Sequence, residues 1–175
     1  TVSDGTDSVT QAITVTITDV DETVPNEAPS FTSSTSYSVN ENQSSAGTLA
    51  ATDADNDTLI YSLGSGTDDE NLNINSSTGV LTFKQNPNFE YSDSYQFTGY
   101  VSDGTIQVSQ SITIVIININ DIPTISSSAT FSATENQSAI GSVSATDEDA
   151  NSLTYSVSGS EINISSSGVL TFASA

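Results

Sequence analysis

The feature that most constrains this chain is a repeat of 94 residues in which the acidic positions return most faithfully. The motifs NEAP (26–29), ENQS (41–44) and ATDAD (51–55) recur as NDIP (120–123), ENQS (135–138) and ATDED (145–149). A period of this length is typical of one small domain used in series, since solenoid repeats are shorter. Acids that keep the register of the repeat suggest that consecutive domains are joined by a ligand that binds acids.

The charge of the chain excludes several classes of partner. It has 22 acidic residues against one basic residue, Lys84, and no histidine, so its formal net charge is −21. Nucleic acid is almost excluded because phosphate contacts need Lys and Arg. Binding to an anionic membrane surface is disfavoured for the same reason. Solubility in a salty medium would explain the overall acidity, but not the acids that follow the repeat.

Cysteine is absent, so disulfide bonds cannot stabilise the fold. An extracellular domain without them needs a good core or a bound metal. No apolar run is long enough to cross a membrane and no signal peptide is present, so we expect any anchor or export signal to lie outside this segment. Without His and Cys the common nucleophile–base pairs are missing, and we do not expect an enzyme.

Alternation of apolar and polar residues predicts β-strands along the chain. Ile13, Val15 and Ile17 share one face of residues 12–18, and residues 111–116 alternate in the same way. Such strands bury one face and expose the other to water, as in antiparallel sheets. Clusters of Gly, Asn, Asp and Ser between them indicate turns. The pattern predicts an all-β, immunoglobulin-like sandwich. Further strands are expected at residues 36–39, 59–63, 79–83, 95–102 and 106–110.

The repeat also predicts the domain organisation. Residues 1–25 resemble the last strands of a preceding domain with its linker, because VSDGT at 2–6 returns at 101–105. Residues 26–121 form one complete domain, and residues 122–175 form the N-terminal part of a following one. The third copy has lost five residues where the complete domain has the acids 68–70, which predicts that these acids form a solvated loop.

Chain ends that fall inside domains leave open sheet edges. A cut from a longer chain would explain them. Alternatively, the strands of residues 1–25 in one copy complete the partial domain 122–175 of another copy. Such strand complementation would build an extracellular filament or sheath.

Five ordered motifs in residues 26–123 resemble those of extracellular cadherin domains, and specifically the bacterial cadherin-like repeats of large surface adhesins. The resemblance implies tandem cadherin-type Greek-key β-sandwiches. It also implies a calcium-binding, extracellular or cell-surface segment that acts as a rigid spacer or adhesive element. The motifs are EN (41–42), DAD (53–55), NFE (88–90), VSDG (101–104) and NINDIP (118–123).

Carried over residue by residue, the resemblance implies Ca²⁺ at two junctions. Calcium takes roughly 6–8 oxygen ligands, so they would converge from separate strands and from the next domain. At the junction after the complete domain the implied ligands are Glu41, Glu90, Asn118, Asn120, Asp121, Asp147 and Asp149, with the carbonyl of Ile119. At the preceding junction they are Asn26, Glu27, Asp53, Asp55 and Asp103; the role of Asp19, Asp21 and Glu22 stays open.

Some positions depart from the family pattern, and each motif has a simpler explanation. Asn88 and Asn118 stand where the family has Asp, and Ile122 where it has Asn, so fewer or more weakly bound ions are expected. Residues 53–57 could be only a polar turn, and Glu41 only an exposed strand end. Because these residues all keep the register of the 94-residue repeat, metal binding is favoured over the simpler explanations.

The alternative to a spacer, besides the filament, is a carbohydrate-binding module. The expected partners are neighbouring domains, identical chains through strand complementation or homophilic contact, and surface glycans.

Overall fold

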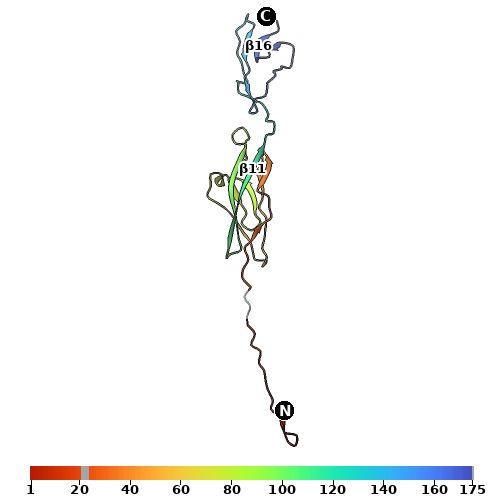
Figure 1. Ribbon diagram of the computed structural model, residues 1–175. Coiled ribbons are helices and arrows are strands. Elements are labelled where there is room, and N and C mark those ends of the chain that lie inside the picture. The colour runs from red at the N-terminus through yellow and green to blue at the C-terminus, as the bar shows by residue number, and fades with distance from the viewer. Residues whose placement is uncertain (21–23, 175) are drawn as a thin grey trace.

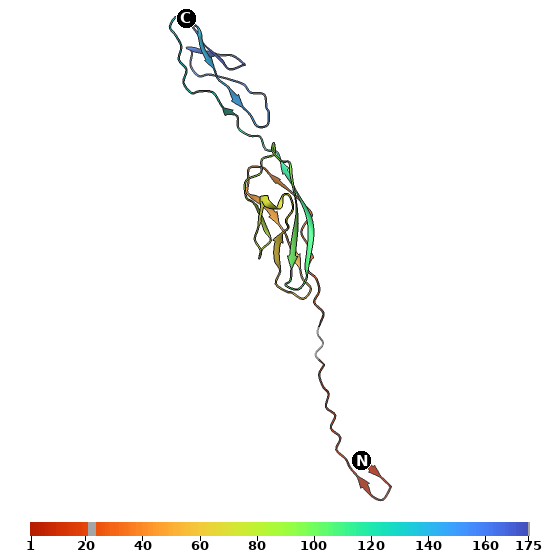
Figure 2. The ribbon, with the colours of Figure 1, turned by 90° about the vertical axis from the view of Figure 1, so that its left-hand side faces the viewer.

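The molecule is drawn out along one axis, with its two termini at opposite ends (Figures 1 and 2). The computed structural model describes residues 1–20 and 24–174. A small hairpin, β1 (Val2–Ser3) and β2 (Ser8–Val9), is followed by residues 10–20, which form no strand, and a central β-sandwich begins with β3. A second group of strands continues beyond the sandwich in the same direction.

The central sandwich confirms the predicted all-β fold. One sheet has the order β4-β11-β10-β7, the other has the order β5-β9-β8, and β3 pairs with β6. The strands are β3 (Ser30–Phe31), β4 (Ser36–Asn40), β5 (Ser45–Thr48), β6 (Ala51–Thr52), β7 (Ile60–Leu63), β8 (Leu72–Ile74), β9 (Val80–Phe83), β10 (Ser94–Ser102) and β11 (Gln107–Ile117).

Strand β11 is the longest strand of the larger sheet. It is one continuous strand, where the sequence predicts two, and it pairs antiparallel with β10 and parallel with β4. Its alternation turns Ile112, Ile114 and Ile116 inward, and all three are buried. They meet Leu49 and Leu81 from the opposite layer, which are fully buried. Burial of this apolar surface is the main force that holds the two sheets together.

The C-terminal strands repeat half of the central sandwich. Their sheet β13-β16-β15 corresponds to β5-β9-β8, and the pair β12-β14 corresponds to β3-β6. Both copies have the same register irregularity in the first of these ladders, between Ser45 and Gly47 and between Ala139 and Gly141. The bounds are β12 (Thr124–Ile125), β13 (Ala139–Ser142), β14 (Ala145–Thr146), β15 (Ile162–Ile164) and β16 (Val169–Phe172).

The strand predicted over residues 12–18 does not form. Ile13, Val15 and Ile17 are 82%, 80% and 90% exposed, and no described residue pairs with this segment. The alternation only says which face would be buried if another strand lay alongside. An extended segment without a partner leaves its backbone groups to water.

The prediction of a solvated acidic loop is wrong for Asp69. This residue begins the single-turn helix η1 (Asp69–Asn71) and is only 6% exposed. Its carboxylate accepts hydrogen bonds from the backbone amides of Gly66 and Thr98. The neighbouring Asp68 accepts another from the amide of Gln96, 2.8 Å away. The two acids therefore tie the loop to β10.

Candidate metal centres at the ends of the central sandwich

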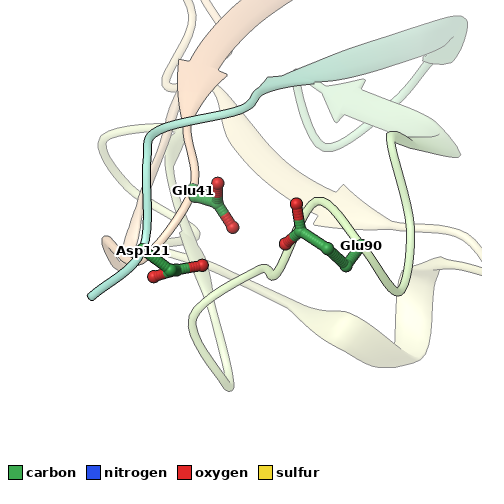
Figure 3. A group of neighbouring side chains, drawn as sticks. All are labelled: Glu41, Glu90 and Asp121. Atoms are coloured by element: carbon green, nitrogen blue, oxygen red, sulfur yellow. The ribbon is translucent and has the colours of Figure 1, made fainter. Parts of the chain in front are cut away.

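Three carboxylates converge at the C-terminal end of the central sandwich. Glu41 directly follows β4, Glu90 lies in the turn before β10, and Asp121 lies in the linker after β11. One carboxylate oxygen of each lies within 4.8 Å of those of the other two. Figure 3 shows the three side chains turned toward one another from these three segments. We call this group the distal cluster.

Glu41 is the anchor of the distal cluster. It is 3% exposed, although it is a charged residue at a strand end. Its Oε2 accepts a hydrogen bond from the Phe89 amide at 2.9 Å, and its Oε1 accepts one from the Ile119 amide at 2.7 Å. A buried carboxylate is stable only when it is paired in this way. Glu41 thus joins the turn that holds Glu90 to the linker that holds Asp121.

Polar side chains of the linker and the next unit surround the distal cluster. The Asp121 amide donates to Asp149 Oδ2 at 2.6 Å, and the Asn118 side chain donates to Glu90 Oε1 at 3.0 Å. Asp121 Oδ2, in contrast, is buried and has no hydrogen-bond partner among residues 1–20 and 24–174. An unpaired buried carboxylate oxygen is costly, and this atom is free to bind a cation.

A second acidic group lies at the other end of the central sandwich. Asp53, Asp55 and Asp57 bring carboxylate oxygens within 4.8 Å of one another, and we call them the proximal cluster. Asp53 Oδ1 accepts from the amides of Asp55 and Asp57, at 2.9 and 3.2 Å. Asp53 Oδ2 is buried and, within the described part of the chain, unpartnered.

The linker contacts repeat at both ends. The Glu27 amide donates to Asp55 Oδ2 at 2.7 Å, which is the contact that Asp121 makes with Asp149 one repeat later. The side chain of Asn26 also donates to Asp103 Oδ2 at 3.0 Å. The 94-residue repeat therefore extends from the sequence to individual hydrogen bonds.

The electrostatics of the two ends differ. Desolvation raises the pKa of Glu90 and that of Asp121, and repulsion from the nearby Glu41 carboxylate raises both further. The pKa of Asp103 is lowered, mainly by the hydrogen bond from the Ile106 amide and then by that from the Asn26 side chain. Like charges at the distal cluster are thus poorly compensated by the protein alone.

Some predicted ligands lie apart from the clusters, and some neighbours were not predicted. Asp147 accepts from the Asn151 amide at 3.1 Å and is not in either three-acid group. Asp19 is exposed, and Asp21 and Glu22 lie outside the described residues. Sequence reasoning missed Asp57, Glu148 and Asn151. Glu148 accepts from the Asn88 side chain at 2.8 Å, and the Asn151 side chain donates to Asn120 at 3.0 Å.

The comparisons with known proteins concern the family and the fold of the central sandwich. The sequence model of the cadherin domain matches residues 35–120. Residues 35–120 belong to the cadherin family. A Drosophila melanogaster protein, the Fat-like cadherin-related tumor suppressor homolog, is 33% identical over 75 residues, which are 43% of this chain and 2% of that protein. The chain thus spans a very small part of the curated relative that it matches.

Solved cadherin structures have the same fold. Repeats EC1-2 of human protocadherin-24 are 25% identical with a TM-score of 0.62, over 85% of this chain and 78% of theirs. Repeats EC1-4 of Drosophila N-cadherin are 20% identical with a TM-score of 0.55, over 85% and 41% of the two chains. This second likeness concerns the fold alone. Cadherin domains are extracellular adhesion modules and not enzymes, which confirms the expectation that the chain has no catalytic role. No helix among the described residues is long and apolar enough to cross a membrane.

Proposed function

We propose that residues 26–121 are a complete cadherin repeat that Ca²⁺ stiffens at both ends, so that the chain serves as a rigid extracellular spacer in a cell-surface adhesion protein. In this proposal residues 1–25 end a preceding repeat and residues 122–175 begin a following one. The neighbouring repeats are then the first partners of the central domain.

The observation that carries the proposal is the unpartnered, buried Asp121 Oδ2 beside two further carboxylates. The protein offers no cation there, because Lys84 is the only basic side chain in the sequence. A bound cation would pair this oxygen and neutralise Glu41 and Glu90. The donors are carboxylate and amide oxygens, which favour a hard ion such as Ca²⁺ over metals that prefer sulfur or imidazole. The residues present therefore fit calcium.

The proposed ligands come from both sides of each junction. Around the distal cluster, the next unit would add Asp149 and the linker would add its amide and carbonyl oxygens. Asp147 is the least supported of the acidic ligands proposed from the next unit, because its carboxylate accepts a hydrogen bond from the Asn151 amide, whereas that of Asp149 accepts one from Asp121 in the distal cluster. The full proposed distal set is Glu41, Glu90, Asn118, Asn120, Asp121, Asp147 and Asp149. The proposed proximal set is Asn26, Glu27, Asp53, Asp55 and Asp103, to which the proximal cluster adds Asp57.

Calcium would stiffen the junctions because it neutralises carboxylates that otherwise repel one another. Without a cation, carboxylates of the linker repel those of both domains, and only a few hydrogen bonds such as Asp121 to Asp149 oppose bending. With a cation, the same carboxylates bind one common centre and the linker is fixed. Amides at Asn118 and Asn120 keep an oxygen ligand without the charge, so we expect modest affinity.

Removal of calcium tests this proposal directly. Small-angle scattering of the chain in Ca²⁺ is expected to give a longer maximum dimension and a narrower distribution of interdomain angles than scattering in chelator. Ca²⁺ is also expected to raise the Tm by several degrees. Mg²⁺ at the same concentration is the control, since it demands a tighter geometry. Identical scattering profiles and identical melting curves in calcium and in chelator would refute the proposal.

The raised pKa values of Glu90 and Asp121 predict opposite pH effects with and without calcium. In the metal-free chain the folded state binds these protons more tightly than the unfolded state, so their contribution to the free energy of unfolding rises as pH falls toward the raised pKa values. With calcium, protons compete for the same carboxylates and the ion is released. Melting curves between pH 7 and about 5 are expected to show a calcium-induced rise in Tm that shrinks steadily. A rise that does not change with pH would contradict this.

Glycan binding and homophilic contact stay predictions, as does the bacterial origin that the resemblance suggests. The proposed location at the cell surface follows from the extracellular setting of cadherin repeats.

A further inference from the structure

Two side-chain amides form hydrogen bonds across the junction that follows the central sandwich. Asn88, in the turn between β9 and β10, donates from Nδ2 to Glu148 Oε2 of the next unit at 2.8 Å. Asn151 of the next unit donates from Nδ2 to Oδ1 of the linker residue Asn120 at 3.0 Å. None of these residues belongs to the distal cluster. Both bonds therefore join protein atoms directly and need no ion between them.

The turn that contains Asn88 determines the orientation of its amide group. Oδ1 accepts a hydrogen bond from the Tyr91 backbone amide at 2.9 Å, and the Asn88 carbonyl oxygen accepts from the Ser92 amide at 3.0 Å. A backbone amide can only donate, so Oδ1 must face Tyr91 and Nδ2 must face Glu148. The side chain is also half-buried. Asn88 thus presents a fixed donor to the next unit, from the turn that also holds Glu90 of the distal cluster.

The bond between Asn151 and Asn120 is oriented in the same way. Nδ2 of Asn120 donates to the carbonyl oxygen of Asp121 at 2.8 Å, which leaves Asn120 Oδ1 as the acceptor. The backbone amide of Asn151 donates to Asp147 Oδ1 at 3.1 Å, which holds the turn that carries the Asn151 side chain. Linker and next unit are therefore joined donor to acceptor, without like charges in contact.

The residues of the preceding junction cannot form either bond. Ninety-four residues before Glu148 the chain has Ala54, whose methyl group cannot accept a hydrogen bond. Ninety-four residues before Asn151 it has Asp57, whose carboxylate cannot donate one to Asn26, the counterpart of Asn120. The turn of the proximal cluster thus has a third carboxylate where the turn of the next unit has an amide. The same repeat therefore contains two chemically different junctions.

We propose that Asn88 and Asn151 are positioning residues that keep the next unit aligned with the central sandwich when no ion is bound. Hydrogen bonds to a charged acceptor are the stronger kind, and the bond from Asn88 to Glu148 is one of them. Together with the bond from Asp121 to Asp149, they favour the aligned conformer over bent ones several-fold. Calcium then stiffens a junction whose orientation is already set, and only this last step rests on the proposed function.

Distances between the two units in chelator test this. The chain has no cysteine, so Ser109→Cys and Ser166→Cys, both at exposed positions, allow one spin label on each unit. Pulsed electron paramagnetic resonance then gives the distance distribution. Asn88→Asp is expected to lower the ratio of aligned to bent conformers about fivefold, because two carboxylates would face each other where the bond was. The new carboxylate still accepts from the Tyr91 amide, so the Tm of the central sandwich is expected to stay unchanged.

A second substitution separates a direct bond from a general effect on the fold. Adding Glu148→Gln to Asn88→Asp reverses donor and acceptor, and it is expected to restore the parent ratio to within about twofold. The matched control is Asn73→Asp with Glu161→Gln, which makes the same changes at exposed residues. It is expected to leave the distribution unchanged. Asn151→Asp, which copies the residue at position 57, is expected to lower the ratio about threefold.

The outcomes distinguish this inference from the proposed function. Equal distributions for the parent and the Asn88→Asp variant in chelator, or no recovery with Glu148→Gln, would overturn the inference even if calcium narrows the parent distribution. If the recovery occurs but calcium leaves the parent distribution and Tm unchanged, the inference stands and the calcium-stiffened spacer does not.

Discussion

The substitution Glu41→Gln is expected to weaken calcium binding at the distal cluster at least about tenfold and to lower the free energy of unfolding of the central domain by about 2 kcal/mol. The amide group keeps the shape of the side chain but removes its charge. One of its two positions would also become a donor that faces either the Phe89 or the Ile119 amide, and both of these amides now donate to Glu41. The loss is large because the carboxylate is buried and water cannot replace it.

Two measurements separate these effects. Calorimetric titration with Ca²⁺ reports the affinity, and urea unfolding in chelator reports the stability without metal. The control is Glu135→Gln, which changes the same residue of the repeated ENQS motif where it is exposed, and it is expected to alter stability by less than about 0.5 kcal/mol. If the two variants bind calcium equally well, Glu41 is not a ligand. If they are equally stable in chelator, its buried hydrogen bonds are not important for the fold.

The substitution Gly79→Ala is expected to destabilise the central domain by about 3 kcal/mol, with a decrease in Tm on the order of 10–20 °C. Gly79 has a φ of +69°, and its new Cβ would lie 2.1 Å from the backbone oxygen of Leu49. Leu49 is fully buried, and its amide donates to the Gly79 oxygen at 2.9 Å. Neither backbone can move away without opening the core.

The matched control for this prediction is Gly104→Ala. Gly104 also has a positive φ, +98°, but an added Cβ would have no atom within 4 Å. Its substitution should therefore cost only the backbone strain, about 1 kcal/mol. Thermal unfolding of both variants in chelator, compared with the parent chain, measures the difference. Equal losses would mean that strain alone, and not the close approach to Leu49, makes Gly79 necessary.

The longer strands of the fold could be predicted because each buries one face. Residues of β4, β7, β9, β10 and β11 alternate over four or more positions, and all five strands were expected. The strands β3, β6 and β8 were not expected because two or three residues carry too little alternation, and β5 was not expected because its sequence, SAGT, has no large apolar residue. The error at residues 12–18 has a different origin. Periodicity identifies an apolar face, but only a neighbouring strand makes that face part of a sheet.

The candidate site was predictable where the repeat reached it. The family resemblance implied that Glu27 and Asp55 belong to one junction and that Asp121 and Asp149 belong to the other, and both pairs are hydrogen-bonded. The carboxylate of Asp57 joins the proximal cluster because a local turn at Asp53 folds the chain back. The acidic residues of a segment do not by themselves predict the geometry of such a turn. Glu148 lies next to the central sandwich because the following unit packs against it there, and its carboxylate accepts a hydrogen bond from the Asn88 side chain.

The parallel pairing of β4 with β11 determines how the rod resists tension. A pull along the chain passes through the short strand β3 to the N-terminal end of β4, and it leaves the domain at the C-terminal end of β11. Because the two strands run in the same direction from Ser36 beside Thr113 to Asn40 beside Ile117, the pull slides them past each other. Their hydrogen bonds are then loaded together and not one after another as in a hairpin that unzips. The domain is therefore expected to resist extension until these hydrogen bonds break together.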